Sequence, residues 1–412
     1  MPIRAYCSLA TFTFDWEAKT PSPPKFQVLD AESFKKQFEW ITEAVDRGVN
    51  PFTKAPIKRK LARIFKWRIE LLSDDEGIAS IWSANWKASR GKADGFVYSL
   101  RVPRESSPEG LPPDGTGYFC PELMKYLIVN PASYDELKTV GVRLITSELS
   151  ERSGRYVSIN GSCAEVLGRG VCIMASKGLG KSTHVYGLAG WTQDGTTKFH
   201  SDGWLFADVK SKVAFSPEKR HYFKGMPSIS LTLRRILSRS KKKNGESSLA
   251  KTIVVKDGFL ADNKDFMGKE KITKKCTLKV FIIFKRDPYD QWLIRPLSAK
   301  DAIDLLESGL GSGASDPYFN PFVVRNPERD EKRRKMYEQL LSGGSIYLVN
   351  TRAQPWITQT LIRGLALEEW SWAKLVDGHV YALRGEKYEP LFKAGAEASR
   401  LEQKVRAGTG IA

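Results

Sequence analysis

Nine consecutive residues have the types and spacing of a phosphate-binding loop. They fit the pattern G-x-x-x-x-G-K-[ST], except that alanine stands in place of the first glycine. Gly178 and Gly180 permit backbone angles that turn successive N–H groups toward a phosphate. Lys181 is expected to reach the outer phosphates, and to face solvent when the loop is empty, while Ser182 is expected to ligate Mg²⁺. The predicted nucleotide-binding residues are Ala175, Ser176, Lys177, Gly178, Leu179, Gly180, Lys181, Ser182 and Thr183.

An acidic residue on a nearby strand usually completes such a site. The segment KFHSDGWLFAD, residues 198–208, supplies two candidates. Asp202 comes about twenty residues after the loop, which leaves room for one helix and a returning chain. Asp208 is the alternative, but its position at the end of an apolar strand is typical of a solvent-facing residue. We therefore predict that Asp202 acts with Lys181 in catalysis, as base, as metal ligand or as both.

The elements that must position these residues can be read from the apolar pattern. An apolar strand, Val171–Met174, leads into the loop, and a helix is expected to begin at Gly180 or Lys181. The pair Asn160-Gly161 predicts a hairpin just upstream. Further strands are predicted at 204–209, 212–216, 277–287 and 345–350, and a helix capped by Ser298 at 298–309.

The first 150 residues have a different character. The stretch IKRKLARIFKWRIELL, residues 57–72, places five apolar residues near one helical face and predicts an amphipathic helix. Residues 104–117 contain three prolines and three glycines and predict a long loop. We expect an accessory or substrate-binding region at 1–150, a nucleotide-binding domain at 151–394 and a tail at 395–412.

The net charge of +18 over 412 residues favours a polyanionic partner. Three segments concentrate it. Residues 54–68 hold seven basic and no acidic residues, residues 232–287 hold 16 basic and 6 acidic, and residues 325–335 hold six basic and three acidic. Nucleic acid would explain all three segments together. The predicted contacts in the first segment are Lys58, Arg59, Lys60 and Arg63.

Cysteine usage and apolar run lengths bear on the compartment. The five cysteines are an odd, scattered set with no C-x-x-C pair, which favours reduced thiols and argues against a zinc ribbon. The longest apolar run of strand type, Val280–Phe284, is far too short to cross a bilayer. Asp15 and Glu17 interrupt any signal-peptide core. A cytoplasmic protein with no membrane association is expected.

The stretch SINGSCAEVLGRGVCIMASKGLGKST, followed by HSDGWLFAD, resembles the P-loop kinases that include HPr kinases and phosphoenolpyruvate carboxykinases. The resemblance covers residues 155–231 and extends more loosely to about residue 365. It implies an α/β fold with a P-loop core and a mixed, strand-rich sheet, here joined to an N-terminal α+β region. It also implies ATP or GTP and Mg²⁺ as cofactors.

The resemblance assigns roles by position. Lys181 and Ser182 match the phosphate and metal residues of the family, and Asp202 matches the first acid of its Asp-Asp pair. Asn160 stands where HPr kinases have histidine, and Gly203 stands where they have the second acid. One carboxylate is therefore expected to do what two often do. Arg220 and Lys224, near a segment similar to the Arg-Gly loop of HPr kinases, are further candidates for phosphate contacts.

The expected function is transfer of the γ-phosphate of a nucleotide onto a hydroxyl group. The basic charge makes nucleic acid the first choice of acceptor. Bacteriophages encode P-loop kinases that phosphorylate hydroxymethyl-pyrimidines within DNA, and a kinase of that kind is expected in the host cytoplasm. A kinase of a protein serine or of a small hydroxylated metabolite is the second hypothesis. The third is a nucleic-acid-binding NTPase without a phosphoryl acceptor.

Overall fold

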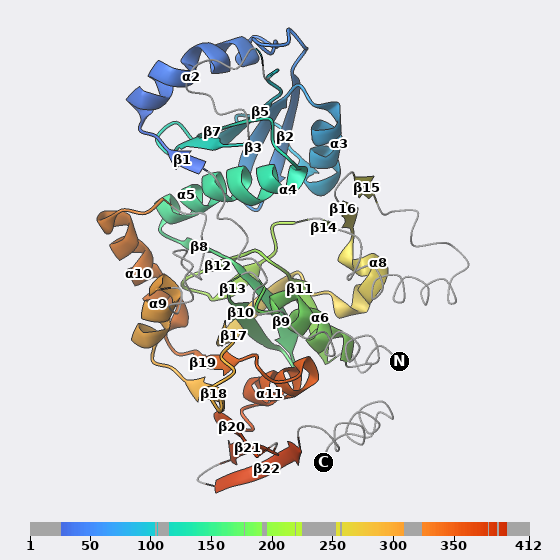
Figure 1. The fold of residues 1–412 in the computed structure, drawn as a ribbon, viewed down its shortest axis with the longest axis vertical. Helices are drawn as coiled ribbons and strands as arrows, with labels where there is room; N and C mark the ends of the chain where they lie inside the picture. The colour runs from blue at the N-terminus through green and yellow to red at the C-terminus, as the bar shows by residue number, and fades with distance from the viewer. Residues whose placement is uncertain are drawn as a thin grey trace, which may run out of the picture.

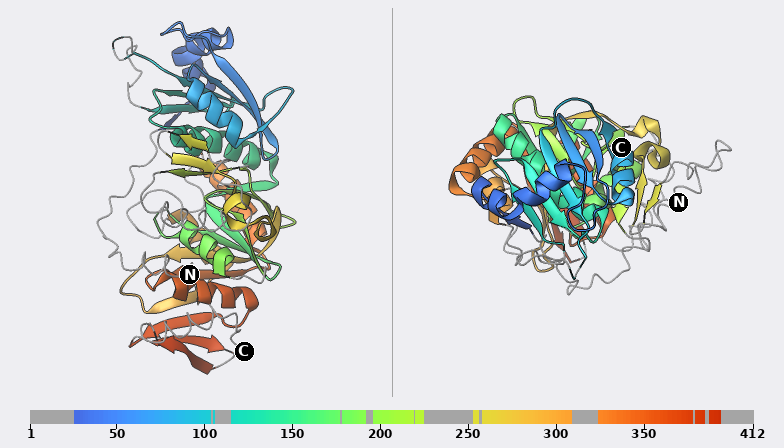
Figure 2. Two further views of the ribbon diagram at one scale, coloured as in Figure 1. Left: turned by 90° about the vertical axis from the view of Figure 1, so that its right-hand side faces the viewer. Right: turned by 90° about the horizontal axis from the view of Figure 1, so that it is seen from above.

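The computed structural model describes most of the chain. It covers residues 26–103, 105, 115–176, 178–191, 196–218, 220–224, 253–255, 258–308, 324–377, 379–384 and 387–393. The protein is a mixed α/β structure with strand-rich sheets. The two larger sheets follow one another along the long axis of the molecule, with helix α5 (Arg143–Ser153) crossing between them (Figures 1 and 2).

The N-terminal sheet has seven strands in the order β1-β6-β7-β5-β3-β2-β4. Its strands are β1 (Phe26–Val28), β2 (Lys58–Ile64), β3 (Trp67–Ser73), β4 (Lys87–Ala88), β5 (Gly95–Leu100), β6 (Gly117–Cys120) and β7 (Lys125–Val129). Helix α2 (Ala31–Asp46) is capped by Asp30, whose side chain accepts from the N–H of Ser33. Apolar residues 34, 38, 41 and 45 of α2 recur at helical spacing and pack on one face of the sheet.

The opposite face of this sheet packs on α3 (Glu76–Asn85) and on a helical segment that leads into the second sheet. That segment runs through α4 (Tyr134–Glu136), a π-helical stretch η2 (Leu137–Val142) and α5. It ends at Gly154, whose φ of 64° is the left-handed conformation that glycine adopts without strain. Trp204 and Phe206 of the second unit enter the same hydrophobic cluster, so the two units share buried apolar surface.

The second sheet has twelve strands, and its main path runs β11-β9-β10-β17-β19-β18-β20-β21-β22. The strands on this path are β9 (Gly161–Val166), β10 (Arg169–Met174), β11 (Thr197–Ser201), β17 (Lys275–Lys285), β18 (Trp292–Pro296), β19 (Ser345–Asn350), β20 (Trp372–Val376), β21 (His379–Arg384) and β22 (Lys387–Lys393). Off this path, β8 (Tyr156–Ile159) pairs with β12 (Leu205–Asp208), which pairs with β13 (Val213–Phe215).

The central strand β10 and the second half of β17, from Val280, are buried on both faces. Val171 and Ile173 pack in a cluster with α6 (Lys181–Trp191) and α11 (Pro355–Leu367). Cys172 and Met174 face the other way, into a cluster with α9 (Ala299–Ser308) and α10 (Pro327–Leu341). This two-faced burial explains why these strands read as continuous apolar runs.

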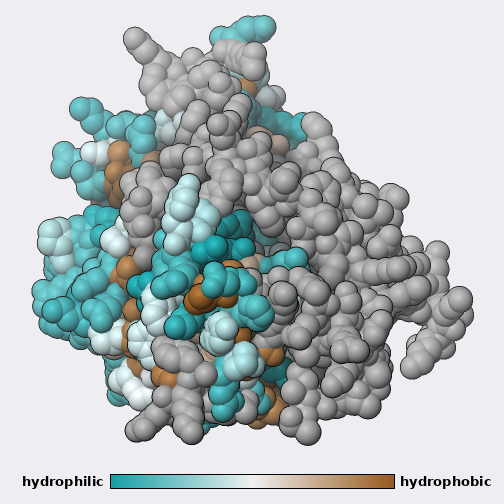
Figure 3. Space-filling model, turned by 60° about the horizontal axis from the view of Figure 1, so that its bottom comes forward, coloured by the Kyte–Doolittle hydropathy of each residue, from teal (hydrophilic) through white to brown (hydrophobic). Residues whose placement is uncertain are grey.

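A smaller sheet pairs with neither of these two, and its strands β14 (His221–Lys224), β16 (Gly258–Ala261) and β15 (Ile253–Val255) follow in that order. It is followed by α8 (Asn263–Met267) and a 3₁₀ turn η4 (Lys269–Lys271). On the face drawn in Figure 3, the described residues are mostly hydrophilic, and the hydrophobic ones form small separate spots.

Several predicted elements are confirmed. The strands at 204–209, 212–216, 277–287 and 345–350 correspond to β12, β13, β17 and β19, and the helix after the loop begins at Lys181. Helix α9 has the predicted cap, because Ser298 Oγ accepts from the N–H of Asp301 at 3.1 Å. The boundary predicted at residue 150 falls inside α5. The predicted tail, 395–412, and most of the predicted loop, 104–117, lie outside the described residues.

Two of the predicted secondary-structure elements are wrong. Residues 57–72 form no helix but the antiparallel hairpin of β2 and β3, in which Ile64 pairs with Trp67. Phe65 turns the chain with φ of 57°, and its ring stacks on Phe206 at 4.6 Å, so a tertiary contact outweighs the local helical pattern. The Asn160-Gly161 pair forms no hairpin either, because β8 pairs with β12 and not with β9. The hairpin lies one strand later, between β9 and β10.

Candidate phosphate-binding and catalytic site

One edge of the second sheet gathers the candidate residues. Strands β10, β17 and β19 run parallel, so their carboxyl ends lie together. Strand β9 is antiparallel to both β10 and β11, which brings the start of β9 and the end of β11 to the same edge. In open α/β sheets, ligands bind outside the carboxyl ends of the strands.

The predicted loop follows β10 at this edge and runs into α6. Gly178 and Gly180 have φ of 88° and 93°, and a Cβ on Gly178 would meet no atom within 4 Å. These positions therefore need glycine for backbone conformation, and not for lack of space. Lys177 lies outside the described residues. The first N–H groups of α6 point their partial positive charge at the loop, as an anion-binding helix end does.

Lys181 adopts a different position from the one expected. Its ammonium does not extend into solvent but donates to the carbonyl of Ala175 at 2.6 Å and to that of Ser176 at 3.1 Å. The side chain is half-buried and curls back over its own loop. A bound phosphate would offer Lys181 stronger, charged acceptors than these carbonyls.

Asp202 lies directly opposite the loop, in the bend between β11 and β12. The hydroxyls of Ser182 and Ser162 both donate to its Oδ1, at 3.0 and 2.5 Å. The side chain of Asp202 is buried, and Gly203, with φ of 76°, turns the chain away behind it. The structure therefore brings Ser162, Ser182 and Asp202 together from three segments, and Lys181 directly precedes Ser182. Sequence reasoning did not single out Ser162.

Asp208 is remote from this arrangement. It ends β12, and Oδ2 accepts from Arg155 at 2.7 Å, while Oδ1 accepts from the N–H groups of Lys210 and Ser211. The expectation that Asp208 faces solvent is wrong, because its side chain is only 4% exposed. Burial would raise the pKa of Asp208, but the Ser211 N–H and Arg155 outweigh it and lower that pKa. Asp208 therefore fixes a turn.

A chain of polar side chains connects Asp202 with the N-terminal unit. His221 Nε2 lies 3.5 Å from Asp202 Oδ2, and His221 Nδ1 lies 3.3 Å from Glu218. Glu218 in turn pairs with Lys138 of η2 at 2.8 Å, and both side chains are nearly inaccessible to solvent. Burial would raise the pKa of Glu218, but Lys138 and His221 outweigh it and hold that pKa at about 2.

Arg143, the first residue of α5, is a second buried charge beside Asp202. Its Nη2 lies 3.8 Å from the position that a Cβ on Gly203 would take, and its guanidinium covers the ring of Trp204 at 5.3 Å. Burial lowers the pKa of Arg143, opposed by the charges of Glu218, Asp135 and Asp202. No pattern in the sequence pointed to Lys138, Arg143 or Glu218, because they lie on segments remote from the loop.

A basic residue also stands at the other side of the loop. Arg286 follows β17, and its Nη2 lies 3.9 Å from the position that a Cβ on Gly180 would take. Its Nε donates to Thr351 Oγ1 at 3.3 Å. The neighbouring His184 is buried in α6, and burial and the charge of Arg286 lower the pKa of His184 to about 3. Sequence reasoning missed Arg286 because the strand order was unknown.

The remaining predicted phosphate contacts have fewer described interactions. Arg220 is half-buried and directly precedes His221, which contacts Asp202. Lys224 is the last residue of β14, but its side chain is outside the part of the chain that the structure describes. Arg220 is therefore adjacent in the chain to a residue that contacts the acid, and the position of the Lys224 side chain stays a prediction.

The donor set suits magnesium in its chemistry. Mg²⁺ is usually held by one or two carboxylates together with substrate phosphates and water, and the neighbouring Ser182 and Asp202 oxygens offer that kind of ligand. Among the described residues, no group of three or more histidine, cysteine, aspartate or glutamate side chains could hold a metal by itself. A nucleotide would have to supply the other ligands.

The basic segment at 325–335 is largely neutralised within the fold. Arg329 pairs with Glu148, and Arg333 pairs with Glu151 at 2.6 Å and Asp330 at 2.5 Å, joining α10 to α5. Further pairs are Arg325–Asp330, Arg334–Asp304, Arg334–Glu307 and Lys335–Glu331. Most basic side chains of this segment are therefore paired with carboxylates of the protein. The positive charge available to a polyanion is smaller than the count of basic residues in the sequence indicates.

The segment at 54–68 is neutralised only in part. Lys58 pairs with Glu76 at 3.1 Å and Arg59 with Glu70 at 3.0 Å. Lys60 and Arg63 are exposed, and no ion pair within the described ranges includes either of them. The segment at 232–287 is described only in part.

The four cysteines at positions 120, 163, 172 and 276 are buried free thiols, and Cys7 lies outside the described residues. No helix among the described residues has the length and apolar character that a membrane span needs. In comparisons with known proteins, no family model matches the chain and no curated protein matches it.

Proposed function

We propose that this protein is a P-loop kinase that transfers the γ-phosphate of ATP or GTP onto a hydroxyl group. The observation that carries the proposal is the contact between Ser182 and Asp202. It joins the last residues of a glycine-rich loop, at a helix N-terminus, to a buried carboxylate in the bend after another strand, β11. A loop, a lysine, a hydroxyl and an acid in this arrangement serve nucleotide and metal binding in phosphoryl transfer.

Each group has a task in such a reaction. The loop N–H groups and the start of α6 would bind the phosphates, and Lys181 would leave its carbonyl partners to neutralise charge on them. The acceptor oxygen bonds to the γ-phosphorus as the bond to the bridging oxygen breaks, which releases the nucleoside diphosphate. Asp202 would orient the acceptor hydroxyl and take its proton. A bound Mg²⁺ would neutralise developing charge on the phosphates.

The acceptor that we propose is nucleic acid, and one feature of the N-terminal sheet supports it. Arg63 on β2 is directly opposite Arg68 on β3 and Lys87 on β4, so three basic side chains form a row across three strands. Like charges directly opposite one another are destabilising, and a phosphate backbone would relieve that repulsion. Arg68 also pairs with Asp94 at 3.6 Å, so the row is only partly compensated.

The test offers ATP labelled at the γ-phosphate to the full chain with DNA bearing hydroxymethyl-pyrimidines, plain DNA, RNA, serine-containing peptides and water alone. Label in nucleic acid supports the proposal. Label in peptide or in a small metabolite keeps the kinase and replaces the acceptor, and free phosphate alone identifies an NTPase. Lys181→Ala and Asp202→Asn are the control variants, and transfer that survives both would place the chemistry elsewhere.

A further inference from the structure

Arg286 occupies a special place in the strand order. It is the residue after β17, and β17 is the parallel neighbour of β10, which leads into the phosphate-binding loop. Its guanidinium reaches Gly180, one residue before Lys181. The side chain therefore approaches the loop from the side opposite Asp202, which follows β11 beyond β9.

The backbone on both sides of Arg286 is fixed to the end of β19. The carbonyl of Lys285 accepts from Thr351 twice, from its N–H at 2.8 Å and its hydroxyl at 3.1 Å. The N–H of Asp287 donates to Asn350 Oδ1 at 3.0 Å. Arg286 therefore projects from a short segment that is anchored at both neighbouring residues.

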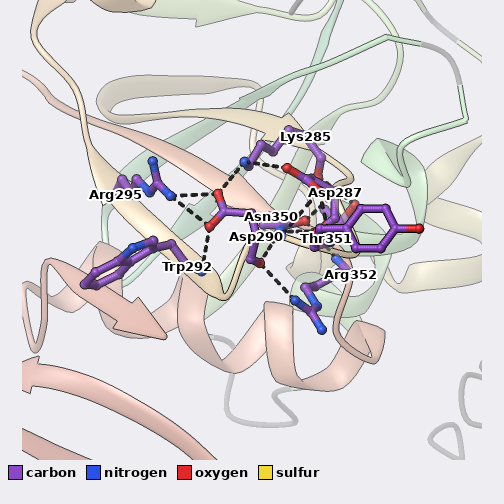
Figure 4. A network of polar contacts seen from close by, with 9 residues as sticks. Lys285, Asp287, Asp290, Trp292, Arg295, Asn350, Thr351 and Arg352 are labelled. Atoms are coloured by element: carbon purple, nitrogen blue, oxygen red, sulfur yellow. Dashed lines mark hydrogen bonds and ion pairs between the residues drawn. The ribbon is translucent and has the colours of Figure 1, made fainter. Parts of the chain in front are cut away.

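The turn that follows, residues 287–290, is also held by hydrogen bonds and ion pairs (Figure 4). Asn350 Nδ2 donates to the carbonyls of Asp287 and Asp290, at 2.8 and 3.0 Å. The carboxylate of Asp290 pairs with Lys285 and accepts twice from Arg295, at 2.8 and 2.9 Å. A turn held by this many polar contacts presents Arg286 in one orientation, which is the condition for electrostatic preorganisation.

We propose that Arg286 donates hydrogen bonds to the phosphate chain of the bound nucleotide and acts as a catalytic residue beside Lys181. The inference rests on the proposed function and adds a second cationic group to it. Arginine matches phosphate oxygens with a planar fork of N–H groups, and a pre-placed arginine stabilises the charge of the transferring phosphoryl group. The Thr351 hydroxyl, which accepts from Arg286 Nε, orients that fork.

The test measures binding by calorimetry of a non-hydrolysable ATP analogue, AMP-PNP, and of adenosine. A hydrogen bond between charged groups is worth about tenfold to a hundredfold, so Arg286→Ala should weaken AMP-PNP binding by about that factor. Adenosine binding should be unchanged, because adenosine has no phosphate. The AMP-PNP affinity of Arg286→Lys should fall between that of the parent protein and that of Arg286→Ala. Lysine keeps the positive charge but loses the planar fork of N–H groups. Thr351→Val should lower AMP-PNP affinity by a smaller factor.

Arg352→Ala is the matched control. Arg352 is an exposed arginine at the same sheet edge, and its Nη1 donates to the carbonyl of Asp290 at 3.0 Å. It should leave AMP-PNP affinity within about twofold of the parent protein. If Arg286→Ala and Arg352→Ala lose AMP-PNP affinity equally, the loss comes from general surface charge, and the proposal is overturned.

Two further outcomes separate this inference from the proposed function. If Arg286→Ala binds AMP-PNP normally while Lys181→Ala does not, the loop binds nucleotide and the role of Arg286 is refuted alone. If the unmodified protein binds neither AMP-PNP nor ATP with Mg²⁺, both fail together. Circular dichroism spectra and melting temperatures of the variants show whether each one is folded. If Arg286→Ala does not fold, Arg286→Lys is used in its place for the binding test.

Discussion

The hydroxyl of Ser182 donates a hydrogen bond of 3.0 Å to Oδ1 of Asp202, 20 residues further along the chain. Ser182 belongs to the first turn of α6, and Asp202 follows a strand that is separated from β10 by β9. The contact therefore joins two segments that the sheet places at one edge. Ser162 Oγ donates to the same oxygen, so the orientation of this carboxylate is fixed before any ligand binds.

Lys181→Ala should lower phosphoryl transfer by at least about a hundredfold, comparable with the loss of one preorganised donor in the transition state. Lys181 donates to two carbonyls of its own loop, so its replacement should change the melting temperature little. Turnover with labelled ATP and a thermal melt are the two measurements. Lys210→Ala, at an exposed lysine in the turn after β12, is the control. Normal transfer by Lys181→Ala would show that the loop is only structural.

Asp202→Asn should abolish transfer while nucleotide still binds, because the amide keeps the shape of the carboxylate and loses its charge. Asp208→Asn should instead keep phosphoryl transfer and lower the stability of the fold. It keeps a hydrogen-bond acceptor for the turn but weakens the contact with Arg155, at a cost of about 1 kcal/mol in the free energy of unfolding. Transfer assays and urea denaturation of both variants test the pair. An inactive Asp208→Asn beside an active Asp202→Asn would exchange their roles.

Glu218→Gln should destabilise the fold by about 3–5 kcal/mol, since it removes the carboxylate that compensates the buried ammonium of Lys138. The double variant Lys138→Met with Glu218→Gln should recover part of that loss, because no buried charge is then left without its carboxylate. Urea denaturation at neutral pH measures both. A single variant that is as stable as the parent would mean that water already solvates this pair.

The ion pair of Lys138 and Glu218 also predicts that acid lowers the stability of the fold. The pKa of Glu218 is about 2 in the folded protein, against an ordinary value of 4.5. The unfolded chain therefore binds a proton first as the pH falls, and the stabilisation present above pH 4.5 is lost toward pH 2. Melting temperatures from about pH 5 to about pH 3 should fall less steeply in Glu218→Gln than in the parent. Identical slopes would contradict the assignment.

Replacement of Arg63, Arg68 and Lys87 by glutamine should weaken nucleic-acid binding and flatten its salt dependence. The logarithm of affinity falls with the logarithm of salt concentration, by about 0.9 per phosphate contact on duplex and about 0.7 on single strands. Fluorescence anisotropy of a labelled oligonucleotide across a salt series measures that slope. The charge-matched control replaces Arg325, Lys332 and Lys335 by glutamine and should keep the parent slope, because Arg325 and Lys335 have carboxylate partners.

Absence of binding by the parent protein to either strand form, at about 50 mM salt where electrostatic contacts are strong, would remove nucleic acid as acceptor. The peptide or metabolite hypothesis would then stand first. A slope that changes equally in both triple variants would show that total charge governs binding, and not the row across β3, β2 and β4.

The sequence by itself determined the elements whose signals are local. Glycines at 178 and 180 between an apolar run and Lys181 predicted the strand, the turn and the start of α6, because backbone conformation and helix termini depend on adjacent residues. Ser298 predicted its helix for the same reason. The pair of Ser182 and Asp202 could be anticipated as well, since a phosphate-binding loop usually has an acidic partner on a nearby strand.

The tertiary structure decided everything that depends on strand order and on contacts between remote segments. Residues 57–72 satisfy a helical pattern, yet they form a hairpin because Phe65 packs on Phe206, far along the chain. Most of the positive charge at 325–335 is paired with carboxylates, some of them on α5, which no count of residues reveals. Arg286 reaches the loop because β17 is inserted beside β10, about a hundred residues away in sequence. The chemistry of a side chain depends on its own residue type, but the residues that it contacts depend on which strands pair.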